Sequence, residues 1–164
     1  MIFVTVGTQL AFDRMVAAVD RWAATRNADA EVFAQIGPGN LVPRHLEYRR
    51  FMTPAQCRER MLAAEAIVAH AGMGTILSAL ELGKPLLVMP RRAALGEHRN
   101  DHQLATTRRF AELGSVSVAM DAAELHRKLD ELDRVEAHDR IGPHAGEPFI
   151  AALREFIAGH PLRA

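Results

Sequence analysis

Cysteine is nearly absent from this chain of 164 residues, in which Cys57 is the single thiol. One thiol can neither close an intrachain disulfide nor form a CxxC-type zinc or redox motif, so a reducing compartment fits best. Apolar residues make up 49% of the chain and charged residues 24%. These proportions are ordinary for a globular protein, and they argue against disorder, collagen-like repeats and a disulfide scaffold.

An excess of charge of either sign is also absent, because 20 Lys and Arg balance 20 Asp and Glu. The chain therefore has no global positive field, and we expect no nucleic-acid partner. No stretch approaches the ~18 apolar residues of a membrane span, and residues 2–6 lack the basic flank and cleavage site of a signal peptide. We therefore expect a cytoplasmic protein that reaches a membrane only through a partner.

Short apolar runs alternate with amphipathic helical segments along the chain. The predicted strands lie at 2–6, 32–36, 46–51, 67–69, 86–89 and 116–119, and the predicted helices at about 13–26, 53–64, 75–82, 98–113, 121–133 and 149–157. The strands are apolar throughout rather than at every second residue, which is typical of a parallel sheet covered on both faces. We therefore predict an α/β fold in which residues 1–164 form a single Rossmann-like domain, with a parallel sheet of about six strands and helices on both faces.

The connection between the second and third predicted strands is unusually short. About ten residues separate Ile36 from Leu46. That length is close to the lower limit for a crossover between parallel strands. We therefore expect a reduced or missing helix at this point.

Two glycine-containing segments follow predicted strands. Gly7-Thr8-Gln9 follows the first strand, and Gly72-Met73-Gly74-Thr75 follows the fourth and opens a helix. Doubly wound sheets bind ligands beyond the carboxyl ends of the strands, where the strand order reverses. Glycines let a phosphate approach the backbone, and unpaired amides at a helix start stabilise an anion. Both segments thus predict a diphosphate site, although packing in tight turns accounts for the glycines equally well.

The string His70-Ala71-Gly72-Met73-Gly74-Thr75 is more specific when it is taken with Gly83-Lys84-Pro85, Pro90 and His102-Gln103. It resembles the family-28 C-terminal domain, which is the C-terminal half of GT-B glycosyltransferases. Residues 91–103 are most similar to bacterial exopolysaccharide subunits of the PssE type, and the similarity spans about 1–118. The resemblance implies a nucleotide-sugar donor domain that works only when it is joined to a second polypeptide.

The resemblance also implies where a UDP-sugar donor would bind. His70 and residues 72–75 would hold the diphosphate, although a histidine that only packs at the strand end is the alternative for His70. Residues 7–9 would face the cleft, and His102 and Gln103 would contact the donor sugar.

Ser78 marks a departure from the family. Many members carry a ribose-binding carboxylate at this position, and Glu81, one helical turn further, is the candidate substitute, with a solvated glutamate at the helix end as the alternative. The donor-binding residues that we predict are Gly7, Thr8, Gln9, His70, Gly72, Met73, Gly74, Thr75, Ser78, Glu81, Arg91, Arg99, His102 and Gln103.

Three arginines, Arg91, Arg92 and Arg99, follow the fifth strand at the expected ligand edge. They could offset the charge of the leaving diphosphate or pair with the carboxylate of a uronic acid. Our hypothesis is a UDP-glucuronate-like donor, with a solvated basic loop as the alternative.

A metal site in the same loop is a weaker interpretation. His98 and His102 are one helical turn apart and lie near Glu97 and Asp101. The His-Glu-x-x-His order is absent, no third ligand is evident, and GT-B enzymes generally need no bound metal. We therefore expect neither a metal nor another cofactor.

The sequence thus predicts the donor-binding subunit of a two-component inverting glycosyltransferase of exopolysaccharide biosynthesis. Its acceptor, linked to a lipid diphosphate, would be held by a membrane-anchored PssD-like partner at the cytoplasmic face of the inner membrane. The apolar stripe at 149–157 either packs on the sheet or docks this partner. No general base is evident, so no catalytic residue is assigned. A nucleotide-binding regulatory or scaffold protein is the alternative, whereas a GT-B epimerase or hydrolase needs a longer chain.

Overall fold

The computed structural model describes residues 1–26, 31–112, 114, 116–132, 141–142, 150–151 and 154. The elements in this part of the chain are β1 Ile2–Thr5, α1 Asp13–Ala24, β2 Val32–Gln35, β3 Glu47–Arg49, α2 Pro54–Ala63, β4 Ala66–His70, α3 Met73–Glu81, β5 Leu86–Met89, η1 Ala93–Leu95, α4 His102–Glu112, β6 Ser117–Val118 and α5 Ala122–Asp130. The helix predicted at 149–157 falls, apart from 150–151 and 154, outside the described residues.

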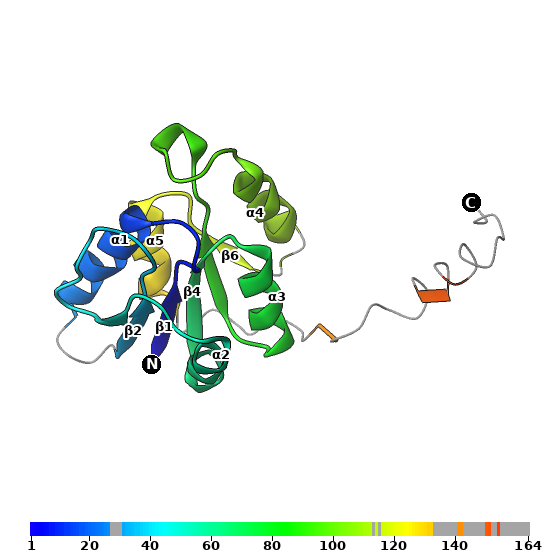
Figure 1. Cartoon of the computed structure of the whole chain (residues 1–164), viewed down its shortest axis with the longest axis horizontal. Helices are drawn as coiled ribbons and strands as arrows, with labels where there is room; N and C mark the ends of the chain where they lie inside the picture. Colours follow the sequence, from blue (N-terminus) through cyan, green and yellow to red (C-terminus); the bar gives the residue numbers. More distant parts are fainter. Residues whose placement is uncertain are drawn as a thin grey trace.

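Six parallel strands form one sheet in the order β3-β2-β1-β4-β5-β6 (Figure 1). This arrangement confirms the predicted α/β Rossmann-like fold. The strand order reverses between β1 and β4, which pair directly, with Thr5 opposite Ala69. The segments that follow these two strands therefore start side by side at the carboxyl edge of the sheet, where doubly wound folds bind ligands.

Neighbouring residues of each strand enter two different cores. Val4 and Val68 pack in the core beneath α1 and α5, whereas Phe3 and Ile67 pack in the core beneath α2, α3 and α4. Figure 1 shows α1 and α5 together on one side of the sheet and α3 and α4 on the other. The strands are apolar at every position because both of their faces are buried.

Two helices begin where short polar patterns predict a cap. Thr53 Oγ1 accepts a hydrogen bond from the Gln56 amide at 3.2 Å, and Gln56 Oε1 accepts one from the Thr53 amide at 3.0 Å. This reciprocal capping box starts α2. Asp121 Oδ1 accepts from the Glu124 amide at 2.9 Å and caps α5, but here the Glu124 carboxylate accepts from the Met120 amide rather than from the cap residue.

The described residues between β2 and β3 contain no helix, as their number predicts. Two carboxylates of α1 bind this connection instead. Asp20 Oδ1 accepts from the amides of Arg44 and His45 at 3.0 and 2.8 Å, and Asp13 Oδ2 accepts from the amide of Asn40 at 3.1 Å. Side chains of α1 thus satisfy backbone groups that a crossover helix would otherwise satisfy internally.

Candidate functional site

Gly7 and Gly72 meet at the imidazole of His70, at the carboxyl ends of β1 and β4. A Cβ atom on Gly7 would lie 2.7 Å from His70 Cε1, and one on Gly72 would lie 2.2 Å from His70 Nε2. Gly7 also has a φ of 75°, a left-handed conformation that side chains other than glycine disfavour. The imidazole is therefore a spacer between the two segments, and packing accounts for both glycines.

Gly74 is different, because outside its chain neighbours and the backbone of its own helix no described atom lies within 4 Å of the place where its Cβ would stand. Helix α3 begins at Met73, two residues earlier than predicted, with Gly72 as an N-cap that has no side chain. The first amides of the helix have no acceptor within it and remain available to a ligand. A ligand at this helix start would account for Gly74, which packing within the protein does not explain.

The His70 ring is neutral at physiological pH. Burial first, and the nearby positive charge of Arg91 second, lower the pKa of His70 to about 4. The Nδ1 atom is buried and has no hydrogen-bond partner among the described residues. The structure thus brings a neutral imidazole between the two predicted glycine segments.

Two buried polar residues fix the segment after β1. Thr5 Oγ1 donates to Gln35 Oε1 at 2.5 Å, and Gln35 Nε2 donates to the carbonyls of Gly7 and Arg50 at 2.9 and 3.2 Å. The Gly7 amide donates to Thr5 Oγ1 at 3.2 Å. Sequence analysis missed this pair, although polar residues in otherwise apolar strands were a signal that could have found it.

Arg91 contacts the backbone of the same segment. Its Nη2 donates to the carbonyls of Val6 and Leu10 at 2.8 and 2.6 Å, and its Nε donates to the carbonyl of Ala11 at 3.4 Å. Arg91 is 3% exposed, and burial lowers its pKa to about 10, with Glu97 acting in the opposite direction. The group therefore stays charged at neutral pH, and its charge lies against the segment after β1 and near His70.

The other predicted residues after β5 differ in their contacts. Gln103 is buried and its Oε1 accepts from the Arg91 amide at 3.1 Å, which ties α4 to the end of β5. Arg92 Nη2 donates to the carbonyl of Met120 at 2.7 Å. Arg99 is exposed and has no hydrogen bond or ion pair within the described ranges. Of the three arginines, Arg99 is therefore the one whose guanidinium is not engaged by any described residue.

Glu97 has a partner that sequence analysis did not find. Arg14 Nε and Nη2 donate to Glu97 Oε1 and Oε2 at 2.6 and 2.8 Å, so the two planar groups form two parallel hydrogen bonds. The Glu97 Oε2 atom also accepts from the Arg92 amide at 2.9 Å. The two side chains are 83 positions apart, and no local pattern in the sequence connects them.

His98 and His102 contact each other edge to face, with ring centroids 4.5 Å apart. Burial, followed by the positive charge of a protonated His102, lowers the pKa of His98. Asp101 Oδ1 accepts from the Ala93 amide at 2.8 Å, and Glu97 is bound to arginine. Within the described ranges, no three His, Cys, Asp or Glu side chains lie together as a metal ion would require.

The segments that follow β1 and β5 border an open hollow of about 510 Å³. It is lined by Gln9, Leu10, Gly96, Glu97, His98 and Arg99. The segment after β5 reaches this hollow through the short helix η1, and α4 begins at His102 rather than near His98. Gln9 and Arg99 thus line one hollow, whereas neither residues 72–75 nor the first turn of α4 are among the residues that line it, and the predicted donor site stays a prediction.

The two candidates for ribose binding lie further along α3. Ser78 is half-buried in the middle of the helix, and Glu81 is exposed at its last residue. At ~1.5 Å per residue, Glu81 lies about 10 Å along the axis from Gly74. The structure thus keeps Ser78 nearer to the helix start and does not bring Glu81 to it.

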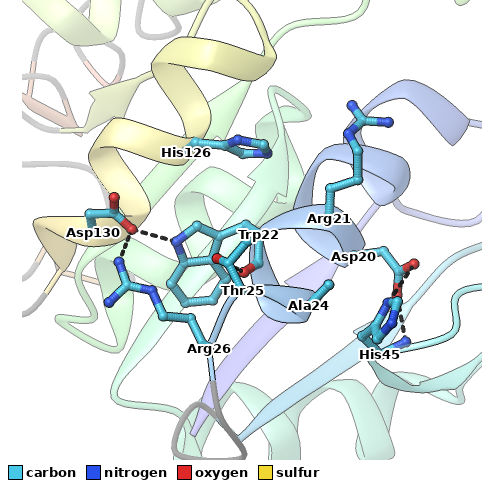
Figure 2. Close-up of a pocket in the computed structure, with 9 residues that line it drawn as sticks. All are labelled: Asp20, Arg21, Trp22, Ala24, Thr25, Arg26, His45, His126 and Asp130. Carbon is cyan, nitrogen blue, oxygen red and sulfur yellow. Dashed lines mark hydrogen bonds and ion pairs between the residues drawn. The ribbon is translucent and has the colours of Figure 1, made fainter.

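A second hollow of about 480 Å³ lies between α1 and α5 (Figure 2). Trp22 Nε1 donates to Asp130 Oδ1 at 2.6 Å, and Arg26 pairs with the same carboxylate. These hydrogen bonds, that of Trp22 first, lower the pKa of Asp130. His126 Nε2 lies 2.7 Å from the carbonyl of Ala18. These polar groups join the two helices, and sequence analysis assigned them no role.

No helix in the described part of the chain is both long and apolar enough to cross a bilayer. The longest one described, α1, has 12 residues. A span needs about 20 predominantly apolar residues.

Known structures resemble this fold. A glycosyltransferase of kitacinnamycin aligns with a TM-score of 0.58 and 22% identity, covering 80% of this chain and 34% of that one. The MurG structure from Acinetobacter baumannii has a TM-score of 0.59 and 16% identity, covering 84% and 45%. The solution structure of ALG13 has a TM-score of 0.55 and 19% identity, covering 93% of each chain. These similarities show the fold of the C-terminal half of GT-B glycosyltransferases.

Sequence relatives agree with that fold. The human UDP-N-acetylglucosamine transferase subunit ALG13 is 30% identical over 122 residues, which cover 69% of this chain and 10% of that protein. The mouse subunit is 30% identical over 106 residues, which cover 59% and 9%. The chain thus spans about a tenth of the length of these curated relatives. Residues 1–140 match the model of the glycosyltransferase family 28 C-terminal domain, and the chain belongs to this family.

Proposed function

We propose that this chain is the donor-binding subunit of a two-component inverting glycosyltransferase. The diphosphate of a UDP-sugar would bind between residues 7–9 and 72–75. Gly74 is the observation that carries the proposal, because it leaves the start of α3 open where first-turn amides lack acceptors. The buried cation of Arg91, which is bound to the segment after β1, adds a fixed positive charge without being hydrogen-bonded to a carboxylate in the described chain.

In the proposed reaction, an acceptor hydroxyl attacks the anomeric carbon while the bond from that carbon to the diphosphate oxygen breaks. The electron pair of that bond stays on the leaving UDP. Amides near Gly74, together with the field of Arg91, would stabilise this charge by several kcal/mol in a site that excludes water. The hydroxyl proton goes to a general base, which we place on the second polypeptide, so no catalytic residue is assigned in this chain.

Recognition of the sugar would come from the loop after β5 and the start of α4. Arg99 is exposed and unengaged in the part of the chain described, so we retain a glucuronate-like donor, whose carboxylate would pair with it. Gln103 and His102 would contact the sugar ring, and Ser78 or Glu81 the ribose. The ALG13 relatives are named as subunits of a UDP-N-acetylglucosamine transferase, which makes that nucleotide sugar the main competitor.

Exposed apolar side chains at the carboxyl edge support a second polypeptide. Leu10, Phe51, Met73 and Leu95 follow four different strands and are 40%, 55%, 49% and 56% exposed. Four other large apolar side chains of the described chain are also exposed, so these four support an interface by their position after the strands. We propose a membrane-anchored PssD-like partner, which would hold a lipid-diphosphate acceptor for exopolysaccharide synthesis and recruit residues 1–164, acting as one domain, to the cytoplasmic face of the inner membrane.

An NMR titration with UDP tests the diphosphate site. We expect the largest amide shifts at Gly7, Gly72 and Gly74. Gly74→Ala should leave thermal stability unchanged or raised, since Ala favours the helix by up to about 1 kcal/mol. The same variant should weaken UDP binding at least about tenfold, because the methyl group fills the space left for phosphate. Shifts confined to the α1–α5 hollow, or equal affinity of Gly74→Ala, would contradict the proposal.

Transfer assays test the remaining steps. Radiolabelled sugar should pass to a lipid acceptor only when this chain is coexpressed with the partner. A pair that binds UDP without transferring sugar would support a regulatory or scaffold protein instead. Competition among UDP-glucuronate, UDP-glucose and UDP-N-acetylglucosamine should favour the uronate, and Arg99→Gln should remove that preference.

A further inference from the structure

The wall of the donor hollow that follows β5 is held by one ion pair. Glu97 lies in this wall beside Gly96, His98 and Arg99. Its carboxylate is bound by Arg14, which comes from the first turn of α1, the helix that follows the segment after β1. One side-chain pair thus connects the wall after β5 to the helix that continues from the opposite wall.

The contact between Arg14 and Glu97 fixes the orientation of the two side chains as well as the distance between them. Both nitrogens of the Arg14 fork donate to Glu97, at 2.6 and 2.8 Å, and Nη2 also donates to the carbonyl of Pro90 at 3.0 Å. A planar guanidinium with three such acceptors has little rotational freedom. Arg14 therefore ties the beginning of the segment after β5 and its middle to one helix.

Glu97 also closes the turn in which it lies. Its Oε2 accepts from the Arg92 amide at 2.9 Å, and its own amide donates to the carbonyl of Arg92 at 3.2 Å. Gly96, with a φ of 69°, makes the turn possible. Loss of the carboxylate would therefore free the turn from α1 and leave the Arg92 amide without its acceptor, while the backbone bond from Glu97 to Arg92 would remain.

Burial separates this pair from the surface pairs. The Arg14 and Glu97 side chains are 22% and 10% exposed, whereas those of Arg109 and Glu112 on α4 are 71% and 67% exposed. Solvated pairs contribute little, while a buried charge that loses its partner is costly.

We infer that Arg14 and Glu97 are positioning residues of the donor site, which hold residues 96–99 against the segment after β1 so that a nucleoside diphosphate meets a preformed wall. This inference rests on the proposed function. It assigns to the pair no contact with the ligand, so the effect on binding would pass through the backbone of the wall.

The experiment is an NMR titration of the full chain with UDP, well below the unfolding temperature. Glu97→Gln should weaken UDP binding by about 10- to 100-fold, the range expected when binding groups are displaced by about 1 Å. Glu112→Gln makes the same chemical change in an exposed pair and should bind UDP as the wild type does. The double variant Arg14→Gln/Glu97→Gln should be no weaker than Glu97→Gln, because the two residues act as one unit.

Arg14→Lys is the second variant, in case Glu97→Gln does not fold. It keeps the charge and loses the parallel hydrogen bonds, so UDP affinity should fall about 3- to 10-fold. If the wild type binds UDP and both variants bind it equally well while only their unfolding temperatures fall, the pair is merely structural and the inference is overturned. A wild-type chain without affinity for UDP would overturn the proposed function, and the inference with it.

Discussion

The hollow at the carboxyl edge and the hollow between α1 and α5 have similar volumes, about 510 and 480 Å³, and both have charged residues in their walls. They differ in how their polar groups are satisfied. Between α1 and α5, Asp130 binds Trp22 directly. At the carboxyl edge, buried nitrogens of His70, Arg92 and His98 have no partner in the described chain.

This difference is more informative than the volumes. Buried polar side chains are nearly always hydrogen-bonded, so each exception points to a partner outside the protein or to a functional constraint. The three exceptions follow or end β4 and β5, where the two glycine segments also lie. We therefore interpret the carboxyl edge as a ligand site and the α1–α5 hollow as a joint between two helices.

Replacement of Arg91 should give the largest effect. Arg91→Met leaves three carbonyls at the carboxyl edge without their charged donor, which should cost about 3 to 5 kcal/mol of the free energy of unfolding. Arg99→Met removes an exposed guanidinium and should change stability by no more than about 0.5 kcal/mol. Urea unfolding of both variants measures the contrast, and equal losses would show that Arg91 does not anchor the segment after β1.

The pH dependence of stability tests His70. Its pKa is about 4 in the folded protein and 6.5 when unfolded, so below pH 6.5 the unfolded state binds more protons. Stability from this group is complete above pH 6.5 and is lost as the pH falls towards 4. His70→Gln should therefore lose about 2 to 3 kcal/mol less than the wild type between pH 7 and pH 4.5. Parallel pH profiles of wild type and variant would exclude a buried neutral imidazole.

The packing of His70 between the glycines predicts a smaller loss of stability, which a second substitution should partly restore. Gly72→Ala places a methyl group 2.2 Å from His70 Nε2 and should destabilise the protein by about 1 to 3 kcal/mol. Gly74→Ala has open space and is the matched control. Adding His70→Ala to Gly72→Ala should recover part of the loss, because the clashing ring is removed. Thermal unfolding of the three variants is the measurement, and failure of the second substitution to recover stability would contradict the spacer role.

The smallest effect is expected at the other hollow. Trp22→Phe removes the indole donor to Asp130 and should lower the free energy of unfolding by about 1 kcal/mol. Its affinity for UDP should equal that of the wild type, since the α1–α5 hollow is a joint. A loss of UDP affinity in this variant, measured by the same NMR titration, would indicate that UDP binds at the α1–α5 hollow and would contradict a site at the carboxyl edge.

The strands and most helices could be predicted because burial leaves a local mark. Residues 86–89 are apolar at every position since both faces of β5 are covered, and the Thr53 to Gln56 spacing marks a helix start. The reversal between β1 and β4 and the two glycine segments also follow from the order of the elements. The start of α3 was predicted two residues too late. Glycine has a low helix propensity, and Gly72 has no side chain that would mark the N-cap, so the sequence gives no signal for the first turn.

The contacts of individual charges could not be predicted. Arg91 was expected to face a ligand, but its guanidinium donates to three backbone carbonyls. Its role in donor binding stays a prediction, in which its positive charge acts on the diphosphate without direct contact. Arg14 lies in an ordinary amphipathic helix, and its partner Glu97 lies 83 positions away. An ion pair across such a separation depends on how two loops meet, for which a single sequence has no periodic signal.

The sequence by itself determined the doubly wound sheet and the edge at which a ligand would bind, because strand burial, helix capping and glycine placement are local or nearly local properties. Only the tertiary structure decided which polar groups are hydrogen-bonded within the protein and which remain available to a ligand. That choice depends on distances of a few ångströms between segments brought together by the sheet, such as those around His70 and Arg91. Hydrogen bonds and close contacts act over that range alone, so the fold must form before they are defined.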